Sequence, residues 1–176
     1  MILEVAKCLT AWLGHATYGV NALLTSTIPR EAGDSAPTVA TISDEFTNAR
    51  SAGGRLPVTL PALSVDIVTS DVVENQVVQD QGDGQVTARI WYGTSNSDFA
   101  AAKREGAYVI RAVAASLRVL AREANVASRT RNSVIFRVAQ NGAVTVQPWF
   151  EQLDDRVITA VASVTYDVRD VLTLPA

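Results

Sequence analysis

The sequence predicts an α+β fold: a mostly antiparallel sheet with two helices packed on one face, plus long hairpin and loop insertions. Two segments carry the apolar periodicity of amphipathic helices, and several shorter segments alternate apolar and polar residues as strands do. Tight-turn signals between neighbouring strands favour antiparallel pairing. The chain has 176 residues and is 48% apolar, which suits a single domain, residues 1–176, with a hydrophobic core.

Residues 2–26 are expected to form the first helix, because their apolar residues recur at steps of three and four. Gly14 and Gly19 weaken this prediction in the second half of the segment, since glycine disfavours helix interiors. Pro29 has no backbone N–H with which to continue the helix, so we expect the helix to end before it.

Residues 29–61 are the least regular stretch, because they contain four of the six prolines and the pair Gly53-Gly54. We expect one short strand at residues 38–42. The rest of residues 29–57 is predicted as a long loop, and loops of this length in compact domains are usually functional or ordered by a partner.

Residues 63–68 and 86–92 alternate with period two and predict two strands. Between them, Gln81-Gly82-Asp83-Gly84 is a turn signal and is expected to form a hairpin tip. We expect a long hairpin over residues 70–85, in which both strands are extended by Val72, Val73, Val77 and Val78.

Residues 98–124 show the strongest helical pattern, and either Ser97 or Asp98 is expected to cap this helix. Apolar residues from Phe99 to Ala124 recur on one face, and four arginines lie almost opposite them. Apolar and aromatic residues flank the arginines, so the helix is predicted to be apolar around more than half its circumference. The arginines are Arg104, Arg111, Arg118 and Arg122, and the flanking residues are Tyr108, Ala112, Ala115 and Val119.

Three more strands are predicted near the carboxyl terminus, at residues 132–139, 143–147 and 157–168. Asn141-Gly142 is typical of a type I′ turn, so the first two of these strands are expected to form a hairpin. The last strand carries a continuous apolar face from Ile158 to Val168.

The chain offers few residues for catalysis, because His15 is the single histidine and Cys8 the single cysteine. These counts exclude a His-rich zinc centre, a multi-cysteine metal site and an internal disulfide. His15 lies on the polar side of the first helix and is expected to face solvent. Cys8 lies near the apolar stripe and is expected to be a buried, inert thiol.

Three local motifs resemble binding sites but lack the required context. Gly53-Gly54-Arg55 is followed by Leu56-Pro57, so no helix amino terminus is there to bind an anion. The segment from Asp80 to Gly84 lacks the ligand spacing of a calcium loop. The acidic cluster of Glu151, Asp154 and Asp155 is expected to be a solvated turn. We therefore predict a protein that is not an enzyme, with no catalytic, cofactor-binding or metal-binding residues and no cofactor.

Net charge and targeting signals limit the partners and the cellular compartment that we expect for this protein. The net charge of −3 argues against a general nucleic-acid binder. No uninterrupted run of about 18 apolar residues is present, so no membrane span is expected. The amino terminus lacks a basic leader before an apolar block, so we expect no secretory signal, and the lone thiol fits folding in a reducing cytoplasm.

The charges separate along the chain. Residues 62–100 contain six acidic residues and one basic residue, whereas residues 101–140 contain eight basic residues and two acidic ones. An ordinary solvated helix face explains such a pattern, and so does docking of an acidic hairpin of one subunit on the basic helix of the next. The long loop, and a helix that is apolar around more than half its circumference, favour docking between subunits over an ordinary solvated face. The interface candidates are Arg104, Arg111, Arg118, Arg122 and Tyr108 on the helix, and Asp71, Glu74, Asp80 and Asp83 in the hairpin.

The order of these elements resembles that of the tail-terminator (tail-completion) proteins of long-tailed bacteriophages, which are small α+β proteins. The resemblance covers most of residues 1–172 and is one of pattern and order, because the family has no short diagnostic motif. The long loop and the hairpin exceed those of the leanest members. The matching segments are Ile2–Leu24, Leu60-Pro61-Ala62-Leu63-Ser64-Val65, Val86–Tyr92, Asp98–Ala124 and Ile158–Val168.

The resemblance implies a structural virion protein of the phage neck, assembled in the host cytoplasm, that forms a homohexameric ring capping the tail tube. The implied partners are copies of itself, the tail-tube protein and the head-closure or connector protein. Nucleic acid would be met only as DNA passing through the ring, and no membrane is implied. A head-closure protein, a neck adaptor or another tail protein remains an alternative, and a small-ligand-binding α+β protein is a less favoured one.

Overall fold

A computed structural model of the protein describes residues 2–44, 59–73, 81–124, 129–131, 134–138, 145–147, 151–153 and 156–171. These residues form three helices and eight strands, which confirms the predicted α+β class. In chain order the elements are α1 (Ile2–Leu13), α2 (Val20–Ser26), β1 (Thr41–Ser43), β2 (Ala62–Val73), β3 (Gln81–Thr94), α3 (Phe99–Ala124), β4 (Arg129–Arg131), β5 (Val134–Val138), β6 (Thr145–Gln147), β7 (Glu151–Leu153) and β8 (Arg156–Val171).

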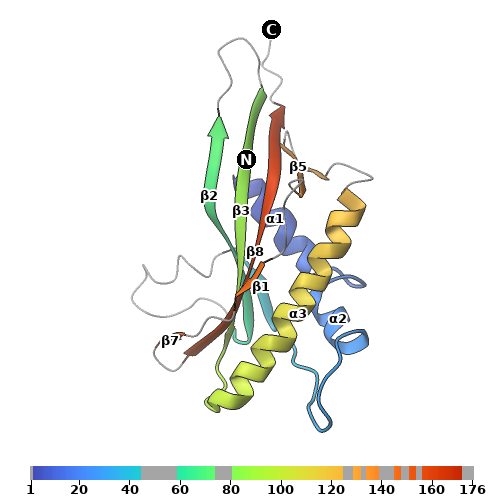
Figure 1. Cartoon of the computed structure of the whole chain (residues 1–176), viewed down its shortest axis with the longest axis vertical. Helices are drawn as coiled ribbons and strands as arrows, with labels where there is room; N and C mark the ends of the chain where they lie inside the picture. The colour runs from blue at the N-terminus through green and yellow to red at the C-terminus, as the bar shows by residue number, and fades with distance from the viewer. Residues whose placement is uncertain are drawn as a thin grey trace.

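All eight described strands belong to one sheet, which is mostly antiparallel as predicted (Figure 1). The strand order is β1-β2-β3-β8-β5-β4, and β6 and β7 also pair with β8. The single parallel pairing in the described sheet joins β1 to β2. The strand expected at residues 38–42 is β1, displaced by a few residues, and residues 45–57 of the predicted loop lie outside the described residues.

The carboxyl-terminal strands correct one prediction. Among the described residues, β5 and β6 each pair with β8 and not with each other, which is not the hairpin expected from the sequence. The pair Asn141-Gly142 lies outside the described residues. Val138 pairs with Tyr166 and Thr145 with Ser163, so β5, β6 and β7 follow one another along one edge of β8. Strand β8 is 16 residues long, and its backbone groups on this edge need partners, which these short strands supply.

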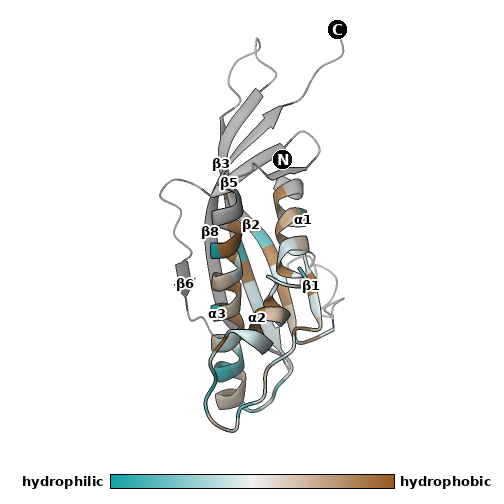
Figure 2. Ribbon diagram, turned by 90° about the vertical axis from the view of Figure 1, so that its right-hand side faces the viewer, coloured by the Kyte–Doolittle hydropathy of each residue, from teal (hydrophilic) through white to brown (hydrophobic). Residues whose placement is uncertain are grey.

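The three helices lie on one face of the sheet, and the core lies between them and the strands (Figure 2). Strand β3 shows the division clearly, because Ala88 and Ile90 are buried while Arg89 between them is exposed. On α3, Val113 and Leu117 are fully buried against this layer. Burying side chains of this size contributes roughly 1.5–3 kcal/mol each, which fixes the orientation of the helix.

The predicted single helix over residues 2–26 is two helices, so three helices rather than two cover the sheet. Gly19 explains the sharp junction, because a Cβ at this position would overlap backbone atoms of His15 and Leu13. Its amide donates a hydrogen bond to the His15 carbonyl at 2.8 Å. The end of α1 is joined to α3 by the Trp12 indole Nε1, which donates to the Ser116 carbonyl at 3.0 Å.

Strands β2, β3 and β8 continue past the ends of α1 and α3 as a blade, defined as residues 71–73, 81–85 and 167–171 (Figure 1). The extension of β2 to Val73 confirms the long hairpin, while Val77 and Val78 lie outside the described residues. The expected hairpin tip at Gln81-Gly82-Asp83-Gly84 is wrong, because these residues belong to β3. They pair with β8 on one edge, and Asp83 and Gly84 also pair with β2. This pairing overrides the low strand propensity of glycine.

Candidate interaction surface

Helix α3 presents the basic residues that the sequence singles out. Arg104, Arg111 and Arg118 are exposed, whereas Val113 on the opposite side is fully buried. Residues seven apart on an α-helix lie on nearly the same side, so these arginines form one line, called the arginine row. The side chain of Arg122, the fourth predicted member, lies outside the described part of the chain.

The start of α3 is fixed to the end of β3 by a network around Glu105. Its carboxylate accepts hydrogen bonds from Thr94 Oγ1 at 3.2 Å, from Asn96 Nδ2 at 3.0 Å, and from the Tyr92 hydroxyl at 3.5 Å. Burial, and then the negative charge of Glu105, raises the pKa of the Tyr92 hydroxyl well above its usual value. The hydroxyl therefore keeps its proton, and the network positions the amino-terminal half of the arginine row.

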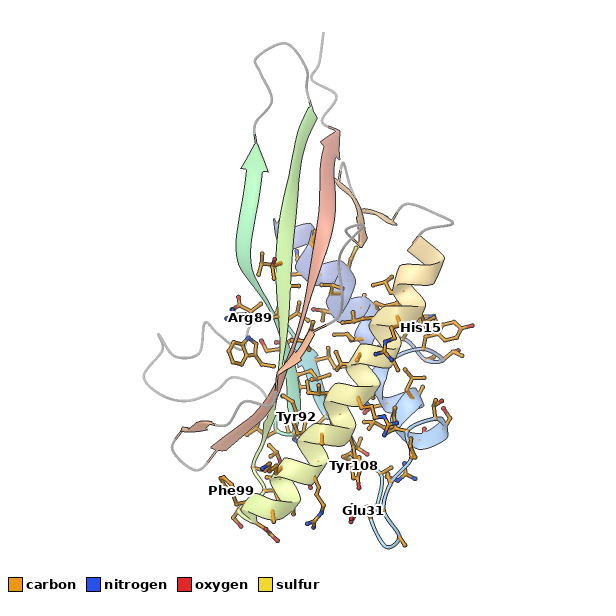
Figure 3. All side chains as sticks on the ribbon, in the orientation of Figure 1. His15, Glu31, Arg89, Tyr92, Phe99 and Tyr108 are labelled. Atoms are coloured by element: carbon orange, nitrogen blue, oxygen red, sulfur yellow. The ribbon has the colours of Figure 1, made fainter. Side chains whose placement is uncertain are left out.

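Asp98 is the cap of α3, which confirms one of the two predicted choices. Its Oδ1 accepts hydrogen bonds from the amides of Ala100 and Ala101 at 2.9 and 3.2 Å. Phe99 was expected on the buried face but is 53% exposed. It lies at the lower end of α3 (Figure 3), so the buried face of the helix begins one turn later, at Ala102.

Residues 28–40, called the strap, contact the amino-terminal half of the arginine row. The Tyr108 hydroxyl donates a hydrogen bond to Asp34 Oδ2 at 2.7 Å and accepts one from the Glu31 amide at 3.2 Å. Arg104 Nε lies 3.9 Å from the same Asp34 oxygen. Figure 3 shows Tyr108 on α3 beside Glu31 on the strap. Two of the predicted interface residues therefore already contact acidic residues of their own chain.

The groups around the Tyr108 hydroxyl shift its pKa in opposite directions. The hydrogen bond from the Glu31 amide lowers the pKa, whereas the hydrogen bond to Asp34 and the negative charges of both acidic residues raise it. The net result is a pKa above the usual value. The protonated hydroxyl is thus the form that holds the strap.

The two ends of the strap are anchored more firmly than its middle. Arg30 Nη1 donates to the Leu24 carbonyl at the end of α2. The Asn21 side-chain amide exchanges two hydrogen bonds with the backbone of Val39, both at 2.9 Å. Between these anchors, residues 31–33 are exposed, and Gly33 has a φ of 95°, a conformation that glycine adopts without strain.

The acidic interface candidates fall in or near the blade. Asp71 pairs with Gln85, and Asp83 pairs with Val73, so both lie in the paired part of the hairpin. Glu74 and Asp80 lie outside the described residues. The blade as a whole contains four acidic residues and one basic residue, which are Asp71, Asp83, Asp167, Asp170 and Arg169.

An aromatic cluster at the α1–α2 junction was missed by the sequence analysis. The rings of Trp12, His15 and Tyr18 stack in pairs with centroid separations of 5.4 to 6.0 Å. His15 is exposed, as predicted, and its Nδ1 accepts hydrogen bonds from the amides of Thr17 and Tyr18. The spacing of three residues between the rings was the available signal, and Gly19 closes the turn that brings them together.

Further predictions from the sequence concern Cys8, metal sites and membrane spans. Cys8 is partly buried and packs against the core. Within the described ranges, no group of three or more His, Cys, Asp and Glu side chains is arranged to hold a metal ion. None of the described helices is long and apolar enough to cross a membrane.

Comparison with known proteins adds no assignment: no known protein family matches the chain, and no curated protein sequence matches it.

Proposed function

We propose that this protein is a structural component of a bacteriophage neck, a tail terminator that forms a homohexameric ring, caps the tail tube and joins it to the head connector. The observation that supports this proposal is the separation of two complementary surfaces on one chain. The exposed arginines of the row lie on α3. The strands of the blade, which contain four acidic residues, continue past the end of that helix (Figure 1).

The strands of the blade continue beyond the end of α3 (Figure 1). Asp71 is the blade residue farthest from the helix in strand order, because it lies in β2 and α3 packs on β8 and β3. Arg111 and Arg118 are exposed and form no ion pair with any residue in the described ranges. An acidic partner for these arginines is therefore best supplied by a second copy.

Contact between the blade of one copy and the arginine row of the next joins two different surfaces. Such a head-to-tail contact closes into a ring when the rotation per subunit permits it. Arginine suits the contact because its planar guanidinium binds a carboxylate through two parallel hydrogen bonds. Charge pairs of this kind fix the orientation of the partners and suppress incorrect pairings.

A ring built in this way can have two unlike ends, which is what a terminator requires. One end must match the tail tube, and the other must offer no further tube-like surface, so that polymerisation stops. The resemblance of the element order to tail terminators supports this choice over other ring proteins.

The first test is the assembly state of the purified full chain at micromolar concentration, measured by mass photometry and electron microscopy. We expect ring-shaped oligomers. A strict monomer at high protein concentration, with no rings in tail-tube preparations, would contradict the proposal.

The double variant Arg111→Glu/Arg118→Glu is expected to abolish ring assembly while the monomer stays folded. Both side chains are exposed, so their reversal leaves the core intact but places like charges opposite each other. The control is Lys7→Glu/Arg89→Glu, which makes the same charge change at two exposed positions away from α3. Circular dichroism checks folding, and loss of rings in the control alone would contradict the assigned surface.

A further inference from the structure

We propose that the strap, residues 28–40, is an autoinhibitory latch that occupies one end of the surface through which copies of this chain assemble. This inference rests on the proposed function and concerns its regulation. The strap brings the acidic residues Glu31 and Asp34 to Arg104 and Tyr108 within one chain. A second copy would bring carboxylates of its blade to the same surface.

The latch is closed mainly by one hydroxyl group. The Tyr108 hydroxyl makes both hydrogen bonds that join the strap to α3, at 2.7 Å to Asp34 and 3.2 Å to the Glu31 amide. The Arg104–Asp34 ion pair is long, at 3.9 Å, and the Arg104 side chain is 49% exposed, so solvent screens it. The closed state therefore depends on few contacts and can open without disturbing the core.

The anchors of the strap let its middle lift while its ends stay in place. Asn21 holds Val39 and Arg30 caps α2 through the Leu24 carbonyl, and neither contact involves α3. Between the anchors no large apolar side chain is fully buried: Asp34, Ala36 and Pro37 are partly buried, and the other residues are exposed. Opening thus requires only the contacts of Tyr108 and Arg104 to break, which frees the amino-terminal half of the arginine row.

The closed latch and a bound neighbour are mutually exclusive at this half of the row. Asp34 Oδ2 already accepts the hydrogen bond of the Tyr108 hydroxyl and lies 3.9 Å from Arg104 Nε, so an incoming carboxylate must displace it. Assembly is then weakened in proportion to the fraction of chains in which the strap is closed. Removing the strap carboxylate should strengthen assembly, although it removes a charge from the chain.

The test uses Asp34→Asn in the full chain, with Glu31→Gln as the matched control. Both variants remove one negative charge from the strap, but the Glu31 contact is made by its backbone amide, which the control keeps. Hydrogen exchange of the strap is measured by mass spectrometry on dilute monomer. We expect exchange about fivefold faster in Asp34→Asn, because a neutral amide oxygen replaces the charged acceptor of Tyr108 and the ion pair with Arg104 is lost, and a change of less than about twofold in the control. Tyr108→Phe, which removes the hydroxyl itself, should exchange at least as fast as Asp34→Asn.

Mass photometry then gives the protein concentration at which half of the chains are assembled. We expect this midpoint to fall about fivefold in Asp34→Asn and to stay within about twofold of wild type in Glu31→Gln. Faster exchange with an unchanged or higher midpoint would overturn the latch alone, as would unchanged exchange in both Asp34→Asn and Tyr108→Phe. Absence of assembly in wild type and all variants would refute the proposed function, and with it the competition on which the latch depends.

Discussion

Both halves of the arginine row are basic, but they differ in what contacts them. In the amino-terminal half, Arg104 and Tyr108 contact the strap, whereas Arg111 and Arg118 in the other half form no ion pair with any described residue. The difference comes from the chain fold, because the strap reaches only the first turns of α3. A charged stripe therefore defines an interaction surface only after the charges already paired within the chain are known.

The largest expected effect is the loss of stability in Gly19→Ala, which should disturb the α1–α2 junction from which the strap continues. A Cβ at Gly19 would overlap the backbone at the α1–α2 junction, and α2 leads directly into the strap. We expect a loss of about 3 kcal/mol in the free energy of unfolding, measured with urea. At Gly14 a Cβ would meet no atom closer than 3.6 Å, so Gly14→Ala is the control and should change stability by less than about 1 kcal/mol. Equal effects of the two substitutions would refute this account of the junction.

A smaller loss is expected from Glu105→Ala, which removes the acceptor of three hydrogen bonds at the start of α3. Leaving the buried Tyr92 hydroxyl and the half-buried Asn96 amide without this acceptor should cost about 2 kcal/mol of unfolding free energy. The control is Glu31→Ala, since the Glu31 side chain is exposed, and we expect a change within about 0.5 kcal/mol. Thermal unfolding of both variants checks the difference, and a Glu105→Ala protein as stable as the control would contradict it.

The smallest expected effect is that of alkaline pH, which should weaken the contact between Tyr108 and the strap. The pKa of Tyr108 is raised, so the strap contact is present at neutral pH and is lost as the pH rises through that value, above the ordinary phenol value of about 10. The difference between the absorbance titrations of wild type and Tyr108→Phe gives the midpoint. A titration midpoint of Tyr108 at or below the ordinary phenol value would show that its hydrogen bond to Asp34 does not stabilise the protonated hydroxyl.

Much of the helix layer could be predicted from sequence. The periodicity of residues 98–124 located α3 almost to the residue, placed its arginines outside and identified Asp98 as a possible cap. Burial of an apolar face dominates the energetics of such a helix, and the spacing of apolar residues along the sequence identifies that face. The exception is Phe99, whose burial depends on where the sheet ends and not on helical spacing.

The strap contacts and the strand pairing could not be predicted in the same way. Asp34 and Tyr108 are 74 residues apart, and no local pattern records that they meet. Gly82 and Gly84 carry the composition of a turn, but pairing with the distant β8 places both in a strand, and β2 also pairs with Gly84. The break at Gly19 had a visible signal, yet its sharpness depends on how closely the backbone approaches.

The central claim is that the arginine row of one copy binds the acidic hairpin of another, and exchange of the charges tests it most directly. We expect Arg111→Glu/Arg118→Glu and Asp80→Lys/Asp83→Lys each to lose or weaken ring assembly in mass photometry, with the remaining assembly sensitive to salt. The chain that combines all four substitutions should recover rings, because the opposite charges face each other again. Failure of the combined variant to recover, with each variant folded by circular dichroism, would contradict the account.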